Sequence, residues 1–210
     1  MPVYTQSGIT FSDSTTQTTK YDSTMDSGRL IATNVYNATG TTTSTYTWTK
    51  PSGCNKVFVQ VVGAGGGGSS YNESGGSGAY AEKLIDMTGV SSVTVTVGGG
   101  GTLVGYYAAA GNGSTSSFGT YCSATGGYGA NQNASHTGGT GGTATGGDLN
   151  IRGGSGTGHG NTGGREAVGR GGASFFGIGH GASHSNNTAN VGYTAPGAGG
   201  VGGAMQSWTG

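Results

Sequence analysis

Hydrophobic and polar residues alternate along the first half of the chain, most clearly between Leu30 and Val97. A period of two with many β-branched residues predicts strands whose side chains point in turn to the two faces of a sheet. On this pattern we expect a small β-sandwich of about five strands over residues 29–97. The predicted strands are Leu30–Tyr36, Thr41–Trp48, Lys56–Val62, Ala79–Ile85 and Val90–Val97.

Turn signals separate the first three of these strands. Asn37–Gly40 and Lys50–Gly53 contain the Asn, Pro and Gly residues that favour turns. The third strand, Lys56–Val62, has the highest density of β-branched residues, which predicts burial on both faces of its sheet.

The pattern changes after Gly98, where clusters of glycine replace the alternating segments. Of the 50 glycines, 45 lie between Gly63 and Gly203, since only five lie elsewhere. No further strand is predicted after Gly98, and no helix is predicted anywhere in the chain. Collagen is excluded, because its glycines recur at every third position beside many prolines, and this chain has three prolines.

A local period of three is visible in Gly138–Thr143, which reads Gly-Gly-Thr-Gly-Gly-Thr. Three residues per turn is the period of polyproline II-type helices, which leave their backbone groups free to bond neighbouring segments. Such a helix would have two glycine faces for packing and one threonine face toward solvent. We therefore expect an all-β chain in which a bundle of polyglycine II helices with apical loops occupies residues 98–210.

Residues 1–28 are rich in Ser and Thr and have few apolar positions. Ile9 and Phe11 alternate as in a short strand. Two interpretations stay open: a flexible arm, or an attachment segment that folds against a partner and uses Ile9 and Phe11.

Composition narrows the classes of function. Charged residues make up 8% of the chain and the formal net charge is zero, so no electrostatic footprint for nucleic acid is present. The sequence has neither a long apolar run nor a basic N-terminal region, which predicts a soluble protein without a membrane span or signal peptide, made in a cytoplasm. Whether Cys54 and Cys122 pair is left open.

One glycine pattern matches a dinucleotide-binding motif, but its surroundings do not fit such a site. Gly63, Gly65 and Gly68 spell G-x-G-x-x-G after a strand, and Glu82 follows at the distance of a ribose-binding acid. A dinucleotide site also needs a helix that opens at the last glycine, and the Ser- and Gly-rich residues that follow cannot supply one. No cofactor is expected.

Catalytic and metal sites are not expected either. The only acidic residues in the loop-bearing half are Asp148 and Glu166, too few for paired-carboxylate catalysis or for a catalytic triad. Four histidines stand among glycines that disfavour a helix, so we interpret them as solvated loop residues rather than metal ligands. They are His136, His159, His180 and His184.

Aromatic and polar residues in the glycine-rich region are candidates for recognition. Aromatic rings give contact area at low entropic cost, and small polar neighbours adapt to a ligand. The candidate receptor-binding residues are Tyr106, Tyr107, Tyr128, His136, His159 and His184. Phe118, Phe175 and Phe176 are interpreted instead as local core.

Several blocks resemble the glycine-rich domain of bacteriophage tail-fibre and tail-tip proteins, and the style is similar to that of distal tail-fibre adhesins of T-even-like phages. The order of these blocks along the chain is more specific than any one of them. The blocks are Ile9–Thr19, Gly40–Pro51, Val57–Gly68, Val93–Gly101, Gly171–Gly177 and Gly197–Gly203.

The resemblance implies a virion protein made in the host cytoplasm, located in a tail or fibre, that is not an enzyme. Its implied partners are other phage tail or fibre proteins and a bacterial surface receptor, either a glycan or an outer-membrane protein, with no nucleic acid. In the adhesins, glycine-rich motifs form a polyglycine II sandwich whose loops bind the host surface. A structural fibre or cap component without receptor binding is the alternative, and a homo-oligomeric state is left open.

Overall fold

The structure is a computed structural model that describes residues 3–5, 8–10, 16–17, 30–69, 73–103, 108–131, 137–158, 160–162, 165–167, 169–179 and 195–200. The chain divides into two compact units. The N-terminal unit comprises residues 1–34 and 51–54, and the glycine-rich unit comprises residues 35–50 and 55–210.

The N-terminal unit contains a three-stranded antiparallel sheet. It is formed in order by β1 (Val3–Thr5), β2 (Gly8–Thr10) and β3 (Thr16–Gln17). Ile9 lies in β2, which confirms the strand predicted around it, and its Cα partners are Tyr4 and Gln17. Phe11 lies outside the described residues.

The predicted strand Leu30–Tyr36 is wrong, because these residues form no strand in the structure. Leu30 is 79% exposed and Val35 is 77% exposed. Alternation produces a strand only where one face finds an apolar surface to cover, and these side chains bury little.

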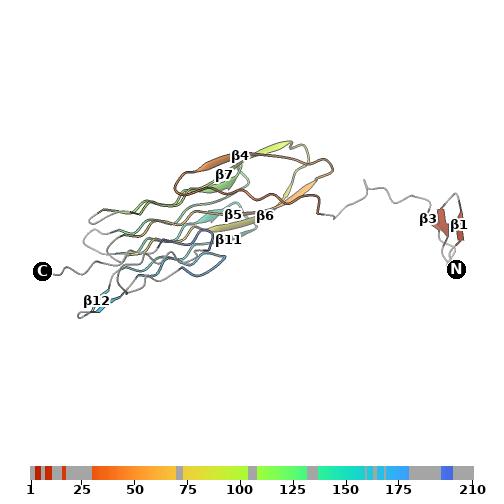
Figure 1. Ribbon diagram of the computed structural model, residues 1–210. Helices are drawn as coiled ribbons and strands as arrows, with labels where there is room; N and C mark the ends of the chain where they lie inside the picture. The colour runs from red at the N-terminus through yellow and green to blue at the C-terminus, as the bar shows by residue number, and fades with distance from the viewer. Residues whose placement is uncertain are drawn as a thin grey trace. The chain divides into compact units, whose positions relative to one another are not determined.

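Two antiparallel sheets lie at the base of the glycine-rich unit (Figure 1). The larger has the order β10-β9-β8-β7-β4 and the smaller has the order β11-β6-β5. The strands of the larger sheet are β4 (Ser44–Thr49), β7 (Ser92–Val97), β8 (Ser116–Phe118), β9 (Cys122–Ala124) and β10 (Ala144–Thr145), and those of the smaller are β5 (Lys56–Val62), β6 (Tyr80–Asp86) and β11 (Leu149–Ile151). A separate hairpin joins β12 (Gly160–Thr162) to β13 (Arg165–Ala167). The described residues contain no helix, and the unit is all-β as predicted.

The core lies between the two sheets, where β5 and β6 contact β8 and β9. Val59 and Val61 of β5 are buried there, whereas Phe58 is 59% exposed. Burial of β5 on both faces was therefore a wrong prediction, because the three-stranded sheet is covered on one side only along most of this strand. Trp48 and Phe118 meet edge to face in this core, with ring centroids 5.7 Å apart.

Strands β8 to β11 correct the expectation that no strand follows Gly98. Each is two or three residues long, too short to show a period in the sequence. Strand β8 pairs with the open edge of β7, where Phe118 is opposite Val95, and β11 pairs with the open edge of β6, where Leu149 is opposite Glu82. Strand β9 then pairs with β8, and β10 pairs with β9. The sandwich is therefore completed by residues from the glycine-rich part of the chain.

Glycine-rich segments continue the strands beyond both sheets and run side by side (Figure 1). We call them the glycine segments. Residues 98–103, 108–115, 125–131 and 137–143 continue the larger sheet, residues 63–69, 73–79 and 152–158 continue the smaller sheet, and residues 169–174 and 195–200 lie against residues 73–79.

The segment 73–79 lies at the centre of the glycine segments and is buried at every residue. Its N–H groups donate hydrogen bonds to three neighbouring segments in turn, so that residues three apart donate to the same neighbour. The bonds, 2.8–3.1 Å long, run from Ser74 and Ser77 to Thr157 and Gly154, from Gly75 and Gly78 to Gly200 and Gly197, and from Gly76 and Ala79 to Tyr128 and Thr125.

Three further segments donate to the carbonyl groups of segment 73–79, which gives it six neighbours. Their donors are Gly63 and Gly66, Gly139 and Gly142, and Gly172. At its glycines this spacing leaves no room for a side chain: a Cβ added to Gly76 would approach the carbonyl oxygen of Thr140 more closely than the 3.0 Å that real Cβ atoms keep. Close approach of backbones, rather than left-handed φ, therefore explains glycine at this position.

Candidate functional site

The outer face of the glycine segments exposes one residue in three. In segment 137–143 the threonines Thr137, Thr140 and Thr143 are exposed, while Gly139 and Gly142 are buried. The predicted solvent-facing threonine row is therefore confirmed. Because neighbouring segments are held in register by backbone hydrogen bonds, their exposed residues line up across the face.

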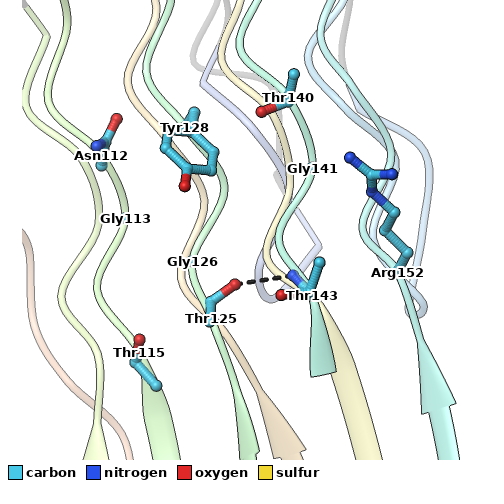
Figure 2. Close-up of a pocket in the computed structure, with 10 residues that line it drawn as sticks. All are labelled: Asn112, Gly113, Thr115, Thr125, Gly126, Tyr128, Thr140, Gly141, Thr143 and Arg152. Atoms are coloured by element: carbon cyan, nitrogen blue, oxygen red, sulfur yellow. Dashed lines mark hydrogen bonds between the residues drawn. The ribbon is translucent and has the colours of Figure 1, made fainter. Parts of the chain in front are cut away.

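Two such cross-rows enclose a shallow trough of about 550 Å³ (Figure 2). We call it the glycine-floored trough, because glycines lie between the rows where side chains would otherwise fill the space. One row contains Asn112, Tyr128 and Thr140, the other contains Thr115, Thr125 and Thr143 with Arg152 beyond them, and the glycines between are Gly113, Gly126 and Gly141.

Backbone bonds fix the register of these rows. The N–H of Tyr128 donates to the carbonyl oxygen of Thr140 at 2.9 Å, and the N–H of Thr125 donates to that of Thr143 at 2.8 Å. The Thr143 N–H in turn donates to Thr125 Oγ1 at 2.8 Å. Asn112 Oδ1 accepts from the N–H of Gly129 at 2.9 Å, which fixes this side chain at the start of the trough.

The side chains of the trough keep hydrogen-bonding capacity for a ligand. Tyr128 is 56% exposed, and neither its hydroxyl nor the Arg152 guanidinium bonds another group among the described residues. No acidic residue lines the trough, so Arg152 supplies its one formal charge. The site combines an aromatic ring, several hydroxyls, one amide and one cation.

Of the predicted receptor-binding residues, the structure places Tyr128 in this trough. The others, Tyr106, Tyr107, His136, His159 and His184, lie outside the described residues. Sequence reasoning missed Asn112, Thr115, Thr125 and Arg152. The period of three in the sequence could have indicated that these residues face solvent. It does not indicate which segments are neighbours, so it could not bring them together in one site.

A second polar and aromatic cluster lies on the outer face of the smaller sheet. The Tyr80 ring stacks on Phe175 with centroids 3.9 Å apart, and Phe176 meets it edge-on at 5.7 Å. Tyr80 donates to Glu82 Oε2 at 2.6 Å and accepts from Gln60 Nε2 at 2.6 Å. Burial, helped by the hydrogen bond to Glu82, raises the pKa of Tyr80 to about 12.

Of the three phenylalanines that were predicted to be local core, one is buried and two are about half exposed. Phe118 is 5% exposed and belongs to the core between the sheets, whereas Phe175 and Phe176 cover Tyr80 and are themselves about half exposed. A tight turn explains this, because Ser174 and Gly177 bond each other and project the two rings from its tip.

Metal and thiol chemistry find no site in the part of the chain that the structure describes. It contains no group of three or more His, Cys, Asp or Glu side chains able to hold a metal ion. Cys54 and Cys122 form no disulfide, and burial raises the pKa of Cys122. None of the described residues belongs to a helix that could cross a membrane.

A family model described as a glycine-rich domain matches residues 41–210. The chain belongs to this glycine-rich domain family. The match begins just before β4 and includes both sheets of the glycine-rich unit, the glycine segments and the glycine-floored trough. No curated protein sequence matches the chain.

Proposed function

We propose that this glycine-rich domain protein is a bacteriophage tail-fibre or tail-tip adhesin that binds the host cell surface through residues displayed on its glycine scaffold. The resemblance of its sequence blocks to phage tail-fibre domains supports the proposal. The observation that carries it is the display of exposed residues, one in three, on hydrogen-bonded glycine segments. We take it to be located in the virion, not to be an enzyme and to bind no nucleic acid.

The proposal includes a polyglycine II bundle as the scaffold. Hydrogen bonds that return to the same neighbour after three residues support it, because three residues per turn is the repeat of this helix. A segment with six neighbours has backbone partners on every side. Such a scaffold is rigid without a large apolar core, so residues that face solvent are free to vary for recognition.

Connections between glycine segments are the proposed place for receptor contacts. Residues 104–107 and 132–136 join segments that lead away from the larger sheet and return to it. Tyr106, Tyr107 and His136 belong to these connections, and loop residues on a rigid scaffold are common in recognition. The proposed receptor is a glycan or an outer-membrane protein.

The N-terminal unit is proposed to attach the protein to another virion protein. Its small sheet is composed of residues 3–5, 8–10 and 16–17, with Ile9 in the middle strand, which supports a folded attachment segment more than a wholly flexible arm. Residues 1–28, including Phe11, would be the attachment arm of the proposal.

The alternative is a structural fibre or cap component with no receptor. Its support is the predominance of threonine on the outward rows, since a row of hydroxyls also serves simple solvation. A homo-oligomeric assembly would be compatible with either role.

Adsorption of phage particles separates the two roles. We would incorporate variants Tyr106→Ala with Tyr107→Ala, or His136→Ala, into particles, and Thr137→Ala as a control on an exposed row. The adhesin role expects the connection variants to lose adsorption while their melting temperature is unchanged, and the control to adsorb normally. Normal adsorption of all variants would support the structural role, and immunogold label away from the tail would contradict both.

A further inference from the structure

We propose that the glycine-floored trough binds a short acidic oligosaccharide, with Tyr128 as the stacking platform and Arg152 as the partner of the acid group. This inference rests on the proposed adhesin function for its biological setting and gives that function a ligand class. It concerns the side face of the glycine segments, not the connections between them.

The shape of the trough fits an extended chain. Its two rows are three residues apart along each segment, which is about 9 Å at a rise of about 3.1 Å per residue. After allowance for the side chains, the floor is about one sugar ring wide. It crosses four hydrogen-bonded segments, so its length is about 14 Å at about 4.8 Å per neighbour.

The surroundings favour a sugar over a peptide. An extended peptide would bind best to an open strand edge that offers backbone donors and acceptors. In the trough several backbone N–H groups already donate hydrogen bonds to neighbouring segments. The N–H of Gly113 donates to the carbonyl oxygen of Gly127, and the N–H of Gly127 donates to that of Ala64. The side chains on the two rows offer hydroxyls and an amide, which match the hydroxyl groups of a saccharide.

Tyr128 provides the one aromatic surface of the trough. It lies in the row of Asn112 and Thr140, with hydrogen-bonding side chains on both sides of its ring (Figure 2). The apolar face of a pyranose ring stacks on such a ring, while its edge hydroxyls bond polar neighbours. An aromatic ring flanked by small polar groups therefore suits a sugar at this position.

Arg152 determines the charge of the proposed ligand. It is exposed, and within the described residues its guanidinium has no carboxylate partner. A guanidinium binds carboxylate in a bidentate fork. A uronic acid residue would therefore bind at the end of the trough near Thr143 and Arg152.

The test uses the full chain on a panel of immobilised oligosaccharides, each uronic-acid member paired with its methyl ester. We expect binding to at least one acidic member and at least tenfold weaker binding to its ester. Tyr128→Ala should weaken binding at least tenfold, and Arg152→Gln should remove the preference for acid over ester. Arg170→Gln, an exposed arginine outside the trough, and Thr137→Ala are the matched controls and should bind as the parent does.

Four results would overturn the inference: no acidic oligosaccharide bound, equal binding of acid and ester, binding unchanged in both trough variants, or competition by inorganic phosphate as strong as that by the saccharide. The last result would indicate a simple anion site. Failure here is separable from failure of the adhesin role, because panel binding is measured on isolated protein and adsorption on particles.

Discussion

The backbone N–H of Gly76 donates a 2.9 Å hydrogen bond to the carbonyl oxygen of Tyr128. Gly76 is fully enclosed, while Tyr128 presents its ring to solvent in the glycine-floored trough. A single bond therefore connects the centre of the glycine segments to the residue that we assign to ligand binding. The position of the ring depends on backbone packing beneath it.

Gly76→Ala should destabilise the glycine-rich unit by more than about 4 kcal/mol or prevent folding, because the added Cβ would overlap the carbonyl oxygen of Thr140. Gly100→Ala is the matched control. Its Cβ would have Gly40 O as nearest neighbour at 3.5 Å, an ordinary contact, so the lower entropy of its unfolded chain should stabilise it by about 0.4–1 kcal/mol. Urea unfolding measures both, and equal midpoints for the two variants would contradict the close-packed centre.

Ser77→Ala should cost about 1–3 kcal/mol of unfolding free energy, since two hydrogen bonds of about 0.5–1.5 kcal/mol each are lost inside the unit. Ser77 Oγ donates to Ala173 O at 2.6 Å and accepts from Gly154 N at 2.8 Å. Ser155→Ala removes only a 3.4 Å contact at an exposed site and should change stability by less than about 0.5 kcal/mol. Thermal unfolding measures both variants. If their unfolding free energies differed by less than about 0.5 kcal/mol, the Ser77 side chain would add nothing beyond the backbone bonds of this residue.

Tyr80 should lose its proton at a higher pH than a tyrosine side chain does in water. Its folded pKa of about 12 lies above the unfolded value, so its contribution to stability is complete below pH of about 10 and is lost as pH rises toward 12. Tyrosinate absorbance, followed against pH, should lose its highest step in Tyr80→Phe. If the absorbance step that is absent in Tyr80→Phe had its midpoint near pH 10, Phe175 and Glu82 would not be protecting the phenol.

Acid should weaken the contact between β6 and the turn before β11. The N–H of Leu84, at 2.9 Å, and then Lys83 lower the pKa of Asp148, so its stabilisation is present above the ordinary Asp value of about 3.9 and is lost as pH falls through the lower folded pKa. Asp148→Asn should melt at a lower temperature than the parent at pH 7. The two melting curves should converge in acid, and a constant gap across this range would exclude the carboxylate charge as the cause.

The sequence predicted the long strands best. The prediction Lys56–Val62 agrees with β5 in both bounds, since seven residues of alternating burial leave a clear pattern. Leu30–Tyr36 had a similar composition but found no sheet to join. Strands β8 and β9 could not be predicted, because three residues show no period, and β8 forms on the edge of β7 while β9 forms on β8.

The sequence predicted two features of the candidate site: one of its residues, and the three-residue repeat of its exposed positions. Tyr128 was found as an aromatic residue among small polar ones, and the threonine row came from the period of three. Asn112 and Arg152 could not be joined to it, because they are far apart along the chain and meet only through the register of four segments. Backbone bonds set that register, and the side chains carry no sequence signal for it.

The bond from Gly75 N to Gly200 O closes the last side of the central segment over 125 residues of chain, the difference between the two residue numbers. Contacts of such long sequence separation make folding slow, on the order of milliseconds to seconds for domains rich in them. During synthesis the amides of Gly75 and Gly78 therefore stay hydrated or wrongly paired until residues 197–200 have left the ribosome. The unit should acquire its resistance to protease in one late step, not segment by segment.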